Sequence, residues 1–203
     1  MKFIKECMNS YDVFYRLGFN HSWDSAGSKD ILKESISANP ESRIMDLGCG
    51  DGYFLYILKS NGLIGAGYGV DLSEEAIQRG NKLYPEINLS VQNLCFTSYP
   101  DDYFDGIIST SLQYVSSPMI AFLEASRLLK SSGWFRFMIP SLEAYYGGEQ
   151  KEECFGLDNT YLPQWKLKRS TWERLMEQSG LKLESPSIPG AIHPECFFFG
   201  RKS

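Results

Sequence analysis

Three glycines and two aspartates in the first half of the chain have the types and spacing of a ligand-binding site. Residues 43–55 read R-I-M-D-L-G-C-G-D-G-Y-F-L, with a glycine at every second position of a turn: Gly48, Gly50 and Gly52. Glycines let the backbone turn tightly and approach a ligand without a Cβ in the way. Asp46 precedes this loop, and Asp71 ends the next apolar segment, nineteen residues after the last glycine. Both carboxylates therefore stand where the strands of an α/β sheet present residues to a ligand.

The two carboxylates narrow the chemistry of that ligand. A loop built for phosphate avoids a carboxylate aimed at its anion, so Asp46 favours a ligand with an ammonium or other cationic group. An acid at the end of the second strand is the usual partner of ribose hydroxyls, which is the role expected of Asp71. A nucleoside joined to a cationic, phosphate-free group describes S-adenosylmethionine better than NAD. Two structural roles stay open: Asp71 as a cap of the following helix, and Asp46 as an acceptor for loop amides.

Alternating strands and helices must position these residues. The residue patterns predict strands at 43–47, 64–70, 87–91, 104–109, 134–139, 181–185 and 195–201. They predict helices within 1–20 and at 28–38, 53–60, 73–83, 118–130 and 170–179, with Ser73 as an N-cap and Asn61-Gly62 as a C-cap. Such alternation forms βαβ units with right-handed crossovers. We expect an α/β fold, a three-layer, doubly wound, Rossmann-like seven-stranded mostly parallel sheet with an antiparallel edge hairpin.

From about residue 40 to the C-terminus, the chain resembles the class I S-adenosylmethionine-dependent methyltransferases of the small-molecule type. D-L-G-C-G-D-G (46–52) and G-V-D-L-S (69–73) resemble the first and second motifs of that family. The later similar segments follow in the same order, at 99–110, 122–140, 172–181 and 197–203. Two features depart from the family pattern. Asn93 stands where an aspartate usually follows the third strand, and K-S-S-G replaces a proline-glycine turn.

The resemblance implies a set of cofactor contacts in this chain. The first motif would hold the methionine part of S-adenosylmethionine, Asp71 would bind the ribose hydroxyls and Leu72 would pack on adenine. Asn93 would contact the adenine amino group, because its amide carbonyl can accept a hydrogen bond from that group. The predicted cofactor-binding residues are Asp46, Gly48, Cys49, Gly50, Gly52, Asp71, Leu72, Asn93, Leu94 and Ser109. The product would be S-adenosyl-L-homocysteine.

The methyl acceptor is expected near the end of the fourth strand and between two flanking segments. The N-terminal segment has no place in the sheet, so we expect it to lie over the site as a lid. Residues 141–165 lack periodicity, and a loop of this length is typical of a binding segment, with an ordinary surface excursion as the alternative. Candidate substrate contacts, each of which can instead be a packing residue, are Tyr11, Tyr15, Gln113, Tyr114, Tyr145 and Tyr146. Methyl transfer requires alignment more than a nucleophile, and no catalytic base is identified.

The overall composition argues against several classes of function. The 203 residues carry 20 Lys plus Arg against 25 Asp plus Glu, a net charge of -5. Nucleic-acid binding needs a concentrated basic surface, so a small-molecule substrate is favoured over nucleic acid. Five scattered cysteines and two histidines form neither a disulfide framework nor a zinc-ligand spacing. The chain lacks the long apolar run of a membrane span, so we expect no membrane association. We further expect a cytoplasmic protein without a metal, either a monomer or a homodimer.

Together these features predict a single domain over residues 1–203. Its parts are an N-terminal helical lid (1–40), an S-adenosylmethionine-binding core (41–140), a lid or substrate insertion (141–170), and a final helix with edge strands (171–203). The predicted function is methyl transfer from S-adenosylmethionine to an O, N or C acceptor by in-line displacement. One alternative is a non-catalytic partner subunit with this fold. The other is an NAD(P)-dependent oxidoreductase, although the glycine loop lacks the G-x-G-x-x-G spacing of that class.

Overall fold

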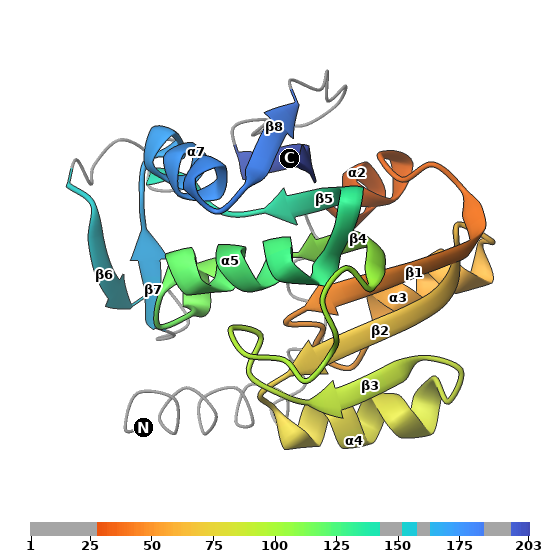
Figure 1. Cartoon of the computed structure of the whole chain (residues 1–203). Helices are drawn as coiled ribbons and strands as arrows, with labels where there is room; N and C mark the ends of the chain where they lie inside the picture. The colour runs from red at the N-terminus through yellow and green to blue at the C-terminus, as the bar shows by residue number, and fades with distance from the viewer. Residues whose placement is uncertain (1–27, 143–151, 158–162, 185–195) are drawn as a thin grey trace.

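A seven-stranded sheet with helices on both faces forms the core of the fold (Figure 1). The computed structural model describes residues 28–142, 152–157, 163–184 and 196–203. The strands of the sheet are β1 (Asn39–Leu47), β2 (Ile64–Asp71), β3 (Asn88–Val91), β4 (Phe104–Ser109), β5 (Leu129–Met138), β8 (Leu181–Glu184) and β9 (Phe197–Lys202). The helices are α2 (Ser28–Glu34), α3 (Tyr53–Ser60), α4 (Glu74–Leu83), α5 (Pro118–Leu128) and α7 (Arg169–Gln178), with a 3-10 turn η2 (Leu112–Tyr114).

The order of strands in the sheet is β3-β2-β1-β4-β5-β9-β8. The first five strands run parallel to one another, whereas β9 is antiparallel to both β5 and β8. The predicted mostly parallel sheet and its edge hairpin are therefore confirmed. The chain changes direction across the sheet at β1, which lies between β2 and β4. In such sheets ligands bind beyond the carboxyl ends of the strands at this switch point, and the glycine loop follows β1 there.

Two apolar clusters, one on each face, hold helices against the sheet. In Figure 1, α5 and α7 lie in front of the sheet, and α2, α3 and α4 lie behind it. The front cluster contains Phe122 of α5 and Trp172 of α7, whose rings meet edge to face with centroids 6.1 Å apart. The rear cluster contains Leu55 and Leu58 of α3 together with Ile44 of β1. Because close-packed interiors deform little, these layers hold the strand ends in fixed positions.

The ends of several helices follow from local residues, as predicted. α4 begins after Ser73, whose Oγ accepts a hydrogen bond from Ala76 N at 3.1 Å. α3 ends at Asn61, and Gly62 has a φ of +68°, in the left-handed region that commonly closes a helix. α5 begins with Pro118, where a backbone N–H would have no partner inside the helix. The predicted caps at Ser73 and Asn61-Gly62 are confirmed.

The first predicted helix and strand have different bounds in the structure. α2 ends at Glu34 and not at 38, and β1 begins at Asn39 and not at 43. Pro40 lies inside β1. The strand tolerates it because the ladder with β2 shifts register between Asn39 and Arg43, so the missing N–H breaks no regular pairing.

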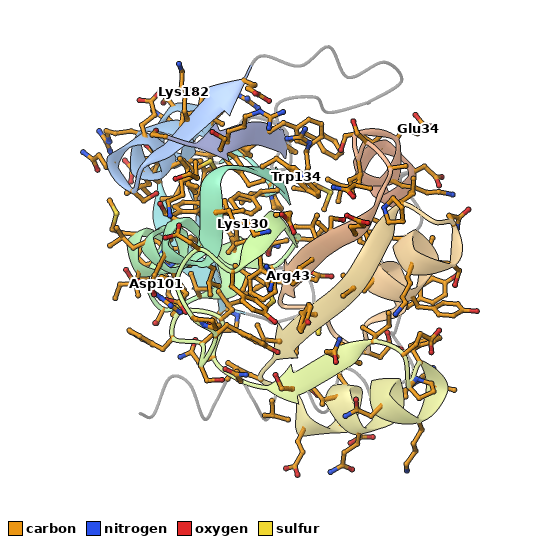
Figure 2. The ribbon with its side chains drawn as sticks, turned by 45° about the vertical axis from the view of Figure 1, so that its right-hand side comes forward. Glu34, Arg43, Asp101, Lys130, Trp134 and Lys182 are labelled. Carbon is orange, nitrogen blue, oxygen red and sulfur yellow. The ribbon has the colours of Figure 1, made fainter. Side chains whose placement is uncertain are left out.

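β5 begins at Leu129, five residues before the predicted start at 134. Its pairing with β4 passes from Leu129 to Trp134 while β4 advances by two residues, so K-S-S-G is a bulge inside the strand and not a turn before it. The bulge brings Lys130 to the carboxylate of Asp105, which also accepts a hydrogen bond from Arg43 N at 2.8 Å. Figure 2 labels Arg43 and Lys130. The bulge thus ties β5 to the amino end of β4 and, through Arg43, to β1.

The excursion at 141–165 contains a ribbon that the sequence pattern did not predict. β6 (Cys154–Leu157) and β7 (Pro163–Lys166) pair antiparallel. Trp165 Nε1 donates a hydrogen bond to Val115 O at 2.9 Å, so the ribbon lies against the segment that follows β4. Of the expected N-terminal lid (1–40), residues 1–27 lie outside the described residues. The remainder forms α2 and the start of β1, and Leu32 of α2 is buried in the rear cluster. Within the described ranges, none of the helices has the length and apolarity that a membrane crossing requires.

Candidate functional site

The glycine loop leaves β1 at Leu47 and folds over the end of β2. Gly48 N and Cys49 N both donate to Val70 O, at 2.8 and 3.0 Å. The three loop glycines have φ of +82°, +58° and +76°, in the left-handed region that favours glycine. A Cβ on Gly48 would also lie 2.5 Å from Ser111 Cβ. Backbone conformation and close packing therefore both require glycine at the start of the loop.

Asp71 ties the glycine loop to the end of β2. Its Oδ2 accepts a hydrogen bond from Gly50 N and its Oδ1 accepts one from Ser73 N, both at 2.9 Å. The N-cap of α4 is Ser73, so Asp71 orients the capping residue and is not itself the cap. A carboxylate offers about four acceptor positions, so two amide donors do not exhaust what Asp71 can accept. The two amide donors fix the orientation of the carboxylate.

Three carboxylates surround the thiol of Cys49. Burial raises the pKa of this thiol well above its ordinary value, and the charges of Asp71, Asp46 and Asp51 raise it further. Asp46 lies inside β1 with only 6% of its surface exposed. Asp51 is also buried, and its Oδ2 lies 3.6 Å from Arg79 Nε. The loop therefore lies in a negative electrostatic environment, which stabilises a cationic group and disfavours a phosphate.

The loop between β3 and β4 borders the glycine loop through Leu94. Leu94 Cδ2 lies 3.5 Å from the position that a Cβ on Gly48 would take. Asn93 Oδ1 accepts a hydrogen bond from Cys95 N at 2.9 Å, which closes a turn around Leu94. The amide carbonyl expected to meet adenine is thus already engaged once, and a second lone pair remains for a ligand by its chemistry. Leu72, the other predicted adenine contact, is half-buried directly after β2.

Hydroxyl groups join the end of β4 to the glycine loop. Ser109 is fully buried; its Oγ donates to Leu47 O at 2.5 Å and accepts from Ser111 N at 3.2 Å. Ser111 Oγ donates to Gly48 O at 3.2 Å. Ser109, predicted as a cofactor contact, thus links β4 to β1, and Ser111 is the residue that reaches the loop. The sequence prediction missed Ser111, because no local pattern marks a residue whose partner lies 63 positions away.

The predicted substrate contacts are only partly described. Gln113 in η2 is 3% exposed, and its Nε2 donates to Thr110 O at 3.1 Å. Its Oε1 is buried without a hydrogen-bond partner among the residues that the structure describes. Tyr114 is half-buried in the same turn. Trp165 lies close to this turn, because its Nε1 donates a hydrogen bond to the O of Val115, the residue after Tyr114. The other four lie outside the described residues: Tyr11, Tyr15, Tyr145 and Tyr146.

One family model and two curated relatives are similar to parts of this chain. Residues 45–137 match the methyltransferase domain family model. The chain is 31% identical over 107 residues to the biotin biosynthesis bifunctional protein BioHC of Teredinibacter turnerae, which covers 45% of this chain and 18% of that protein. It is 27% identical over 114 residues to a Bacillus subtilis protein described as a 23S rRNA (guanine-N(1)-)-methyltransferase, YxjB, over 55% of this chain and 38% of that protein. The match thus spans well under half the length of either relative.

Solved structures agree with the fold over nearly the whole chain. A methyltransferase in complex with the Trm112 methyltransferase activator of Haloferax volcanii matches with a TM-score of 0.77. The match is 18% identical in sequence and covers 95% of this chain and 97% of that one. The two chains thus share the arrangement of strands and helices. At 18% sequence identity the similarity shows a common fold and nothing about function.

Proposed function

We propose that this chain, whose residues 45–137 match the methyltransferase domain family, is a class I S-adenosylmethionine-dependent methyltransferase. It would transfer the methyl group of S-adenosylmethionine to an O, N or C atom of a small molecule. One observation carries the proposal: the carboxylate of Asp71 is held by Gly50 N and Ser73 N beside three glycines with left-handed φ. An oriented acceptor at the end of the second strand suits ribose hydroxyls. The carboxylates around Cys49 suit the cationic remainder of the cofactor.

The chain's residues would bind and align the cofactor. When bound, S-adenosylmethionine would supply a methyl group bonded to a positively charged sulfur. The acceptor would displace the sulfur from the methyl carbon in line. Asp71 would accept hydrogen bonds from the ribose hydroxyls, and Asp46 would compensate the charge of the ammonium group. Leu72 and Leu94 would pack against the adenine. Asn93 Oδ1 would accept a hydrogen bond from the adenine amino group. Alignment and the exclusion of water account for the rate in this mechanism, without a nucleophile on the protein.

The acceptor would lie beyond the end of β4, next to η2. The buried Oε1 of Gln113 would accept a hydrogen bond from an N–H or O–H of the acceptor, because an unsatisfied buried carbonyl is costly. The net charge of -5 supports a small acceptor over RNA, which requires basic surface. The similarity to BioHC, named for biotin biosynthesis, supports the same choice, whereas the similarity to YxjB supports RNA.

Binding and transfer assays test the proposal separately. In calorimetry we expect S-adenosylhomocysteine to bind and NAD not to bind; the opposite result would favour the oxidoreductase alternative. With S-adenosylmethionine carrying a tritiated methyl group, we expect transfer to pooled metabolites and none to purified ribosomal RNA. Transfer to the RNA alone would contradict the small-molecule proposal while leaving the cofactor site intact.

A role as a partner subunit is the second candidate function. The observation in its favour is the similar methyltransferase solved in complex with an activator protein. A chain that binds S-adenosylhomocysteine but transfers no methyl group to metabolites or RNA would fit this role. Co-purification from cells that express the tagged chain, followed by the same transfer assay on the complex, separates a catalytic subunit that needs activation from one without activity.

A further inference from the structure

An acid–base pair on α5, with Glu124 buried and Arg127 partly exposed, holds the loop that borders the cofactor site. Glu124 is 8% exposed, and its Oε1 accepts hydrogen bonds from Thr97 N and Thr97 Oγ1, each at 2.7 Å. Arg127, one turn later on the helix, donates to both carboxylate oxygens: Nη2 to Oε1 at 2.7 Å and Nε to Oε2 at 2.8 Å. Burial alone would raise the pKa of Glu124, but the hydrogen bonds from Arg127 and Thr97 outweigh burial and lower it. The carboxyl group is therefore ionised at neutral pH.

The same guanidinium reaches further along the β3–β4 loop. Arg127 Nη1 donates to Tyr99 O at 2.8 Å and to Asp101 Oδ1 at 2.6 Å. Asp101, labelled in Figure 2, lies on this loop, which runs beside α5 in Figure 1. Glu124 and Arg127 of α5 thus bind the loop at positions 97, 99 and 101. This stretch of the loop has no helix or strand of its own.

The other end of this loop is tied to the cofactor site. Gln92 N donates to the backbone O of Asp71 at 3.0 Å, and Asp71 is the residue expected to bind ribose. The next residues form the turn in which Asn93 Oδ1 and O accept from Cys95 N and Phe96 N, both at 2.9 Å. Thr97, which Glu124 holds, follows this turn at once. The turn that carries the predicted adenine contacts is therefore held between the end of β2 and α5.

We propose that Glu124 and Arg127 are positioning residues that set the β3–β4 loop for the adenine of the cofactor, an inference that rests on the proposed function. Stability alone is a poor reason for this pair, because the cost of removing the Glu124 carboxylate from water can offset what its charged partner contributes. The pair instead fixes the orientation of the loop. The Glu124 carboxylate binds both donors of Thr97, and the planar guanidinium of Arg127 binds the backbone carbonyl of Tyr99. The segment Asn93-Leu94 is thereby kept against the glycine loop.

The test compares two ligands that differ only at the adenine. S-adenosylhomocysteine carries it, and S-ribosylhomocysteine has a hydroxyl group there. For Glu124→Gln, calorimetry should show binding of S-adenosylhomocysteine weakened about tenfold, the size expected for losing a charge-assisted hydrogen bond. Binding of S-ribosylhomocysteine should be unchanged. Arg127→Lys, which keeps the charge but loses the planar fork, should show the same selective loss. The control Glu184→Gln breaks a matched but exposed pair with Arg201 and should change neither affinity.

Each outcome separates this inference from the proposed function. If the unchanged protein binds no S-adenosylhomocysteine, the proposed function fails first. If it binds and Glu124→Gln loses both ligands equally, or loses neither, the positioning role is wrong. If Glu124→Gln does not fold, Thr97→Val replaces it, because this near-isosteric change removes only the hydroxyl donor. A selective loss of about threefold is then expected, as for one weak hydrogen bond, and no selective loss overturns the inference.

Discussion

Replacing Gly48 by alanine should destabilise the protein more than the same change at Gly62, and the structure supplies the size of the difference. Both glycines have a left-handed φ, +82° and +68°, which costs an alanine about 1–2 kcal/mol. At Gly62 a Cβ meets no atom within 4 Å, so that cost stands alone. At Gly48 a Cβ would lie 2.5 Å from Ser111 Cβ and 2.7 Å from Ser111 Oγ. Overpacking of this kind adds about 1–3 kcal/mol, so Gly48→Ala should cost about 2–5 kcal/mol in total.

Urea unfolding of a double-mutant cycle isolates the clash. Ser111→Gly removes the two atoms with which the new Cβ would clash but leaves the φ cost. The coupling energy between Gly48→Ala and Ser111→Gly, in the free energy of unfolding, should therefore be about 1–3 kcal/mol. Gly48→Ala should also weaken S-adenosylhomocysteine binding, because the loop must shift away from Ser111, whereas Gly62→Ala should bind normally.

Two results would refute this reasoning. Equal losses of stability for Gly48→Ala and Gly62→Ala would show that the contact with Ser111 does not constrain the loop. A cycle without coupling between the substitutions at Gly48 and Ser111 would show that the extra cost has another origin. Either outcome would remove the argument that close packing, as well as backbone conformation, requires glycine at the start of the loop.

Three further predictions concern charged and acidic groups of the site. Asp71→Asn should abolish most of the rise in melting temperature that S-adenosylhomocysteine produces, whereas Asp102→Asn, on the exposed pair with Lys202, should keep it in the same thermal-shift assay. Because the pKa of Cys49 is raised, its thiol stays protonated and should be alkylated by iodoacetamide far more slowly at pH 8 than in the urea-unfolded chain, as peptide mapping by mass spectrometry would show; equal rates would contradict the raised pKa. Because the pKa of Glu124 is lowered on folding, its contribution to stability is present above its unfolded value and lost as pH falls through the folded value. Glu124→Gln should therefore flatten the loss of unfolding free energy below about pH 4.5, measured by urea titration, and an unchanged slope would contradict the ionised pair.

Much of the fold could be predicted because its signals are local. The alternation of apolar strands with helices of about ten residues predicts the parallel sheet, and Ser73 and Asn61-Gly62 mark helix ends through bonds to residues three or four positions away. The glycine loop is likewise a local signal, since left-handed φ at every second position demands glycine. The sequence by itself therefore determined the fold class, the loop and the strand end that carries Asp71.

Contacts between distant segments decided the rest. β1 starts at Asn39 and β5 at Leu129 because neighbouring strands offer partners there, which overrides Pro40 and the turn residues before Trp134. The roles of Ser111 and Glu124 rest on partners 63 and 27 positions away along the chain, and no periodicity in their own segments announces such pairs. Chain topology alone brings these partners together, since a strand or helix brings its residues to distant segments only when the sheet is assembled. The sequence thus determined the types and order of the candidate binding residues, and the tertiary structure decided which residues hold them in place.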